Sequence, residues 1–194
     1  ELGLADDTRP IVFIDGHRSD SFGPLLATHE LEILDLHETG VPVMRSSVST
    51  TYEGRPLAAL NTAFAIGGIY LHVAADTAIG APLHLIFIAS NQPSVAQQPR
   101  VVINLEPGAQ LQVVQHFIGS ASSASWTNAV TQITQGTGST LRLCRLQEQS
   151  DTQLHTELLT GELADDSSLE LGYVDLGGSL VRNDAQIDLK GPGA

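Results

Sequence analysis

A tight polar turn followed by a strand of alternating apolar residues recurs along this chain at nearly constant spacing. The turns are Glu-Pro-Gly at 106–108, Gly-Thr-Gly at 136–138 and Ala-Asp-Asp at 164–166. The strands that follow have equivalent leucines, and the steps are 30 residues from Leu111 to Leu141 and 28 residues from Leu141 to Leu169. Strands at a near-constant period, without helices between them, indicate a solenoid. We therefore expect an all-β dominated chain with parallel β-helix coils.

Stacking of successive coils explains which residues occupy the repeated positions. Equivalent residues of neighbouring coils in a parallel β-helix lie about 4.8 Å apart. One inward ladder is expected from Leu111, Leu141 and Leu169, and a second from Val113, Leu143 and Leu171. The residues between the ladders are expected to face water, with Arg142 placed to form an exposed ion pair with Glu170. In the first coil two registers fit, with either Ile79 or Leu83 beneath Leu111.

The turns contain residues that tolerate positive φ angles. Gly108, Gly138 and Asp166 end the first three turns, and Gly193 ends a fourth, Gly-Pro-Gly at 191–193. No strand follows this fourth turn in the sequence. We expect the array of coils to be truncated there, and an open coil end predicts association, including an end-to-end homodimer.

The first 68 residues do not follow the repeat, and we expect a leader over 1–68 and coils over 69–194. The apolar run 11–14 ends in Asp-Gly, a hairpin signal, and 31–36 is expected to be its partner strand.

Three further segments complete the organisation of the chain. Residues 55–65 predict a helix with Pro56 in its first turn. Residues 45–54 form a polar linker, and 90–100 an excursion between coils.

Composition excludes several classes of protein. The net charge is −13 and the single lysine is Lys190, so the chain lacks the basic cluster that nucleic-acid binding needs. No apolar run approaches the roughly 20 residues that span a bilayer. The single cysteine, Cys144, cannot form an internal disulfide. With no Met and no signal peptide at its start, the chain is expected to be an internal fragment of a longer cytoplasmic protein.

The histidines and the cysteine are the candidate ligands for a metal or a cluster. The histidines are mostly far apart in sequence, unlike the close pairs of zinc sites, and they are His17, His29, His37, His72, His84, His116 and His155. His84 and His116 are placed to lie on neighbouring coils. Cys144 shares the outward phase of Arg142, although free cysteines are most often buried. We favour structural roles for all of these and expect no metal site.

Pairs of carboxylates are candidate catalytic groups, because β-helices also include carbohydrate-active enzymes. Glycoside hydrolysis commonly uses paired carboxylates. Asp165 and Asp166 lie at a turn that favours aspartate for local hydrogen bonding. Asp184 and Asp188 alternate with apolar residues and are expected on a solvated face, and Arg-Asn-Asp at 182–184 is expected at a coil corner. A carbohydrate-active lyase or glycosidase remains the alternative function, with a structural adhesin as a third.

Four segments, taken in order, resemble the SufB/SufD family of iron–sulfur cluster assembly proteins. They are Leu-Asn-Thr-Ala-Phe at 60–64, Asn-Leu-Glu-Pro-Gly-Ala-Gln-Leu at 104–111, Trp-Thr-Asn at 126–128 and Gly-Gly-Ser-Leu-Val-Arg-Asn-Asp at 177–184. The segment at 60–64, preceded by the apolar strand at 11–14, looks more like SufD than SufB.

The resemblance implies a right-handed parallel β-helix that acts as a non-catalytic scaffold in a cytoplasmic complex with a SufB-like subunit and a SufC-like ATPase. The absence of a Gly-rich phosphate loop with a following Lys agrees with this division of labour. The family's cluster-site histidine and its SufB–SufD contact lie in later coils, so no catalytic, cofactor-binding or metal-binding residue is carried over to this chain. The iron–sulfur cluster would be handled by the full complex.

Overall fold

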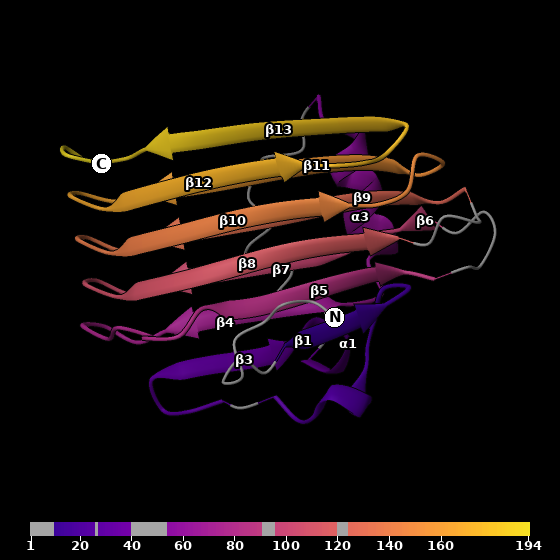
Figure 1. The fold of residues 1–194 in the computed structure, drawn as a ribbon. Coiled ribbons are helices and arrows are strands. Elements are labelled where there is room, and N and C mark those ends of the chain that lie inside the picture. Colours follow the sequence, from indigo (N-terminus) through magenta and orange to yellow (C-terminus); the bar gives the residue numbers. More distant parts are fainter. Residues whose placement is uncertain (1–9, 26, 40–53, 91–95, 120–123) are drawn as a thin grey trace.

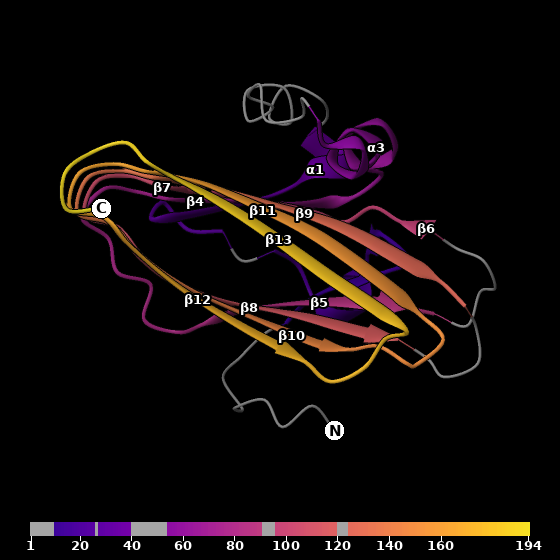
Figure 2. The same ribbon diagram turned by 90° about the horizontal axis from the view of Figure 1, so that it is seen from above.

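Two sheets face each other in the computed structural model, which describes residues 10–25, 27–39, 54–90, 96–119 and 124–194 (Figures 1 and 2). The six-stranded sheet has the order β12 (Ser168–Asp175), β10 (Thr140–Glu148), β8 (Gln110–Gly119), β5 (Leu83–Ala89), β1 (Ile11–Ile14) and β2 (His17–Arg18). The seven-stranded sheet has the order β13 (Leu180–Leu189), β11 (Leu154–Leu163), β9 (Trp126–Gln135), β7 (Arg100–Leu105), β4 (Gly68–Val73) and β3 (Leu31–Asp35). Its seventh strand, the short β6 (Ala96–Gln97), also pairs with β9.

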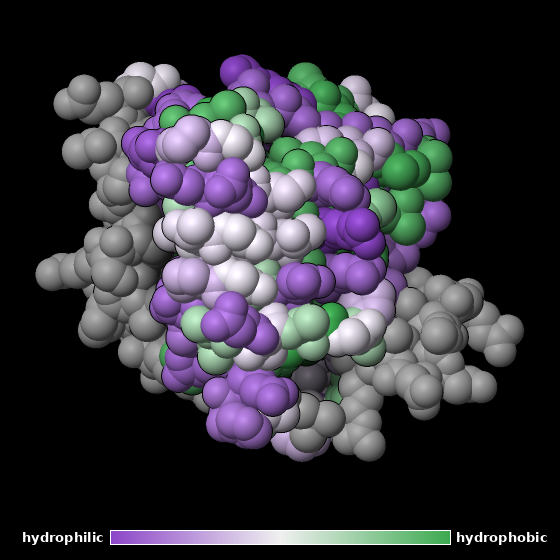
Figure 3. All heavy atoms as spheres, turned by 90° about the vertical axis from the view of Figure 1, so that its left-hand side faces the viewer, coloured by the Kyte–Doolittle hydropathy of each residue, from purple (hydrophilic) through white to green (hydrophobic). Residues whose placement is uncertain are grey.

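From β4 onward the chain passes back and forth between the two sheets, and each strand pairs in parallel with the equivalent strand of the next coil. This is the predicted β-solenoid. The last residues of the four turns, Gly108, Gly138, Asp166 and Gly193, all have positive φ. Figure 3 views the edge formed by these turns, where hydrophilic and neutral residues predominate.

The predicted inward ladders are confirmed by the strand register. Leu141 pairs with Leu111 on one side and Leu169 on the other, and Leu143 pairs likewise with Val113 and Leu171. The two ladder leucines of β10 are buried, while those of β12 are partly buried at the end of the stack. Between the ladders, exposed Arg142 and Glu170 form the expected ion pair at 2.9 Å.

The first coil has the register that places Ile79 beside Leu111. Ala78 forms a bridge with Gln110, and the Ile79 amide donates to the Gln110 carbonyl at 3.0 Å. Leu83 instead pairs with Val113. Residues 80–82 therefore face only residue 112 of the next coil, and this local insertion allows both apolar residues to contribute to the core.

The leader strands extend the two sheets at the end of the solenoid opposite β13. β1 pairs with β5 in parallel, and β3 pairs with β4 antiparallel. The expected pairing between 11–14 and 31–36 is therefore wrong. Its physical reason is that both edges of β1 are occupied, one by β5 and the other by β2, through the predicted hairpin at Asp15 (φ 50°) and Gly16 (φ 88°). Of the linker at 45–54 and the excursion at 90–100, residues 45–53 and 91–95 lie outside the described residues.

The hydrophobic core of the solenoid contains a stack of aromatic rings. Phe87 lies between Phe13 and Phe117, with ring centroids 5.0 and 4.9 Å apart and nearly parallel planes. These rings join the leader strand β1 to the first two coils, so the leader shares one hydrophobic core with the solenoid.

The predicted helix forms as α3 (Pro56–Phe64), with Pro56 in its first turn, and lies against the outside of the seven-stranded sheet (Figure 2). Its Asn61 side chain is fully buried and donates hydrogen bonds to the carbonyls of Pro99 (3.1 Å) and Asn128 (2.8 Å). Ala58 packs with Val130 and Leu158. The other described helices are the short α1 (Leu36–Thr39) and a 3₁₀ turn, Asp20–Phe22. None of the described helices is long and apolar enough to cross a membrane.

Candidate functional site

A buried ion pair lies inside the solenoid, away from the turns. Arg145 on β10 and Glu157 on β11 point inward from opposite sheets and are 1% and 4% exposed. The Arg145 Nε atom lies 3.0 Å from Glu157 Oε2. The guanidinium also contacts the carboxylate of Asp175 and lies 4.8 Å from the centre of the Tyr173 ring.

Hydrogen bonds extend this pair across several coils. Thr131 donates to Glu157 at 3.2 Å, and Gln115 donates to Thr131 at 3.1 Å. At the other end, the Asn183 amide donates to Asp175, whose side chain is 35% exposed. Burial, with the nearby Glu157 charge second, raises the pKa of Tyr173 to about 12. These side chains form one connected polar network inside the solenoid.

His155 lies between this network and the aromatic stack and is fully buried. Its Nδ1 atom lies 2.9 Å from Gln149 Oε1, and its ring packs edge-on against Phe117 at 4.7 Å. Its Nε2 atom has no hydrogen-bond partner and lies 3.9 Å from Glu157 Oε2.

His84 and His116 lie on neighbouring strands of the six-stranded sheet, as predicted. Their rings stack with centroids 5.7 Å apart, and His116 Nε2 lies 2.7 Å from Glu148 Oε2. Burial, and secondly the adjacent His116, lowers the pKa of His84.

The other described histidines are spread over the leader and the first coil. His17 lies 6.0 Å from His37, centroid to centroid, His29 is exposed, and His72 lies between Glu32 and Glu106. Within the described ranges, no three His, Cys, Asp or Glu side chains are arranged to hold a metal ion.

Cys144 is exposed on the outer face of β10, in the phase that the alternation predicted. Its strand neighbours are Val114 and Gly172.

The carboxylate expectations were met in part. Asp166 has φ 54° and forms the third turn, and Asp184 is exposed. The expected coil corner at 182–184 is wrong, because these residues lie within strand β13. There Arg182 pairs with Asp184 at 2.9 Å, so side-chain pairing replaces the expected bonds to the backbone.

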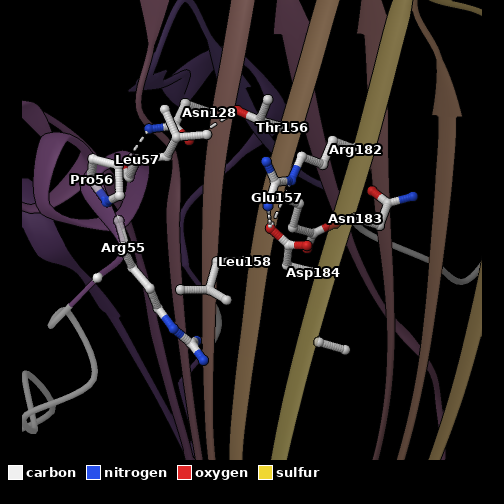
Figure 4. A pocket seen from close by; sticks show the side chains of 13 residues that line it. Arg55, Pro56, Leu57, Asn128, Thr156, Glu157, Leu158, Arg182, Asn183 and Asp184 are labelled. Carbon is white, nitrogen blue, oxygen red and sulfur yellow. Dashed lines mark hydrogen bonds and ion pairs between the residues drawn. The ribbon is translucent and has the colours of Figure 1, made fainter.

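A groove opens between α3 and the edge of the seven-stranded sheet (Figure 4). It encloses about 630 Å³. Its walls are the start of α3 and the strands β9, β11 and β13, with side chains including Arg55, Leu57, Asn128, Thr156, Leu158 and Arg182.

The end of the solenoid at β12 and β13 is a second accessible surface. Each of these strands pairs on one side only within the described residues. Leu169, Leu171 and Ile187 are only partly buried there, and Leu189 is 62% exposed.

The sequence analysis did not predict the buried Arg145–Glu157 ion pair or the position of Arg55 in the groove. A signal for the pair was present, because Arg145 has the inward phase of Leu141 and Leu143, and Glu157 that of Leu159. A charged residue at an inward position calls for a partner across the interior. No comparable signal marks Arg55.

Comparison with known proteins agrees with this fold. The family model described as "SUF system FeS cluster assembly, SufBD core domain" matches residues 87–194. Protein ABCI7, chloroplastic, from Arabidopsis thaliana is 28% identical over 95 residues, which cover 48% of this chain and 20% of that protein. The chain thus spans only a small part of the length of this relative. Because the family model covers more than half of the chain, including every coil from β8 onward, the chain belongs to the SufBD core-domain family of the SUF iron–sulfur cluster assembly system.

Proposed function

We propose that the chain is a non-catalytic scaffold subunit of the SUF machinery, of the SufD type, and that it works in the cytoplasm beside a SufB-like subunit and a SufC-like ATPase. The observation that carries the proposal is the family match over residues 87–194, which supports a role in iron–sulfur cluster assembly. The assignment to SufD rests on the resemblance at residues 60–64. In this proposal the chain binds no cofactor itself, and the cluster is the cargo of the complex.

The architecture suits a scaffold. The charged groups inside the solenoid are bound to one another rather than presented to a substrate, as in the Arg145–Glu157 pair. Asp165 and Asp166, the adjacent carboxylates considered for carbohydrate chemistry, lie in a turn, and Asp166 has the positive φ that the turn requires. The open end at β12 and β13 offers unpaired strand edges for association.

Copurification tests the proposal. The full-length protein, tagged and recovered from its own cells, should bring with it an ABC-type ATPase and a second β-helix subunit. Recovery of neither, together with measurable polysaccharide cleavage by the purified protein, would overturn it.

The open end also carries the proposal of an end-to-end homodimer. A mass measurement in solution on the purified chain should give twice the monomer mass at high concentration. A monomer at every concentration contradicts the homodimer but leaves the scaffold role intact.

A further inference from the structure

We propose that the groove beside α3 docks a partner protein, and that the docked segment carries a carboxylate that pairs with Arg55. This inference rests on the proposed scaffold role, since a scaffold works through the surfaces that bind its partners. The groove lies on the outer face of the seven-stranded sheet and reaches its edge strand β13, whereas β12 contributes no residue to it.

Arg55 is exceptional among the basic side chains of the described ranges. The others are bonded to carboxylates or to amide and hydroxyl groups, in pairs such as Arg18–Asp35, Arg142–Glu170, Arg145–Glu157, Arg182–Asp184 and Lys190–Asp188, and in the contacts of Arg100 with Asn61 and Gln132. Arg55 forms no ion pair with any described residue, and its Nη1 atom is buried without a hydrogen-bond partner. The chain has 22 acidic residues against 9 basic ones, so a shortage of carboxylates does not explain this.

The carboxylates at the groove are already engaged. Asp184 pairs with Arg182 at 2.9 Å, and Glu157 pairs with Arg145 inside the solenoid. The first turn of α3 contains no acidic residue. Among the described residues that line the groove, Arg55 is therefore the charged side chain without an ion-pair partner, and its buried Nη1 donor lacks an acceptor. Because a guanidinium binds a carboxylate through two parallel hydrogen bonds, an acidic side chain of a partner is a suitable counterpart for Arg55.

The rest of the lining indicates what accompanies the carboxylate. Pro56 and Leu57 contribute apolar surface from the start of α3 (Figure 4), and the exposed Ala185 contributes it from β13. A bound segment therefore needs an apolar side chain close to its acidic one. Charge and apolar surface together favour a peptide segment of a partner protein over a small anion, which would leave the apolar lining uncovered.

Photo-cross-linking in cells tests the inference on the full-length protein. A photoreactive amino acid replaces Pro56, which is exposed and lines the groove; a matched control replaces Ala63, which is exposed on the same helix but outside the groove. We expect a cross-link from position 56, and mass spectrometry of the cross-linked peptide should find an Asp or Glu within a few residues.

Charge variants make the test specific. Arg55→Glu and the neutral Arg55→Gln should each lower the cross-link yield, the first by at least about tenfold. Arg142→Glu, an exposed arginine on the other sheet, should leave the yield unchanged. Thermal unfolding of each purified variant excludes loss of the fold as the cause. Exchanging the partner's acidic residue for Arg should restore the yield in the Arg55→Glu background.

The outcomes separate this inference from the proposed function. It is wrong if position 56 cross-links no more than position 63, if it cross-links only to this chain, or if Arg55→Glu leaves the yield unchanged. Copurification of the SUF partners alongside any of these results would leave the scaffold role standing. A charge-dependent cross-link to a protein outside the SUF machinery would instead confirm the groove and contradict the proposed function.

Discussion

At the scale of single residues, two arginines of β10 form ion pairs of opposite character, one with a glutamate of β12 and one with a glutamate of β11. Arg142 and Glu170 meet in solvent on the outer face, whereas Arg145 and Glu157 meet inside with almost no exposed surface. Removing one partner of a buried pair leaves the other charge buried without a counter-ion and lowers the free energy of unfolding by about 3 to 5 kcal/mol. Removing one partner of an exposed pair costs about 0 to 1 kcal/mol.

We therefore expect Arg145→Leu to lower the free energy of unfolding far more than Arg142→Leu does. Urea denaturation of both variants, followed by circular dichroism, measures the difference. Equal losses in the two variants would show that the interior pair is solvated. A double variant, Arg145→Leu with Glu157→Leu, should recover part of the loss, because neither charge is then left buried alone.

His84 gives a second prediction at this scale, concerning pH. Its pKa in the folded protein lies below the ordinary value of 6.5, through burial and then through His116. The unfolded chain therefore binds this proton more readily, and the His84 contribution to stability is lost as pH falls through 6.5 towards the folded-state pKa. Between pH 7.5 and 5.5 the wild type should lose more stability than His84→Gln. Thermal melts of the two proteins across this range measure the difference, and parallel losses of stability in both would contradict the prediction.

At the scale of elements, the position of α3 against the sheet depends more on the side-chain amide of Asn61 than on the helix propensity of the α3 residues. Asn61 donates to two backbone carbonyls of the sheet and accepts from Arg100 Nη1 at 3.3 Å. Asn61→Ala removes all three hydrogen bonds, at about 0.5 to 1.5 kcal/mol each. The Pro99 carbonyl keeps its bond from the Val130 amide, and Arg100 Nη1 keeps its bond to Thr62. Hydrogen exchange of the α3 amides should rise strongly in this variant. Phe64→Ala, at an exposed position on the same helix, should change it little, and equal effects would contradict a role for Asn61 as the anchor.

Elements were predicted from the sequence where the signal is local. The turns and the leucine ladders follow from alternation and from residues that accept positive φ, and α3 follows from Pro56 and the helical pattern. Pairings that depend on how the strands and the two sheets are arranged in space could not be predicted from the sequence. The partner of β3 is β4 because the β1 hairpin occupies the competing edge, and Arg145 finds Glu157 only once the distance between the sheets is known. The groove likewise depends on where α3 lies against the sheet.

At the scale of the whole molecule, stability in a stacked solenoid is approximately a sum over coils and the interfaces between them. The strands β8 and β9 each have a paired neighbour on both sides and bury their inward residues, whereas β13 pairs with β11 alone, and most of its residues are exposed or only partly buried. The coil at β12 and β13 therefore loses less on opening than the coils inside the stack.

Native-state hydrogen exchange of the chain of 194 residues should accordingly show a gradient along the stack. Amides of β13 are expected to exchange fastest among the long strands, those of β11 more slowly, and those of β9 near the rate of global unfolding. The leader strands should resist this fraying, because the Phe13, Phe87 and Phe117 rings join β1 to the coils above it. Mass spectrometry of peptic fragments measures all of these segments in one experiment. Uniform protection from β9 to β13 would mean that something other than the described strand pairing stabilises the open end. Repeating the exchange on diluted protein would then show whether two associated chains are the cause, because protection by association falls on dilution.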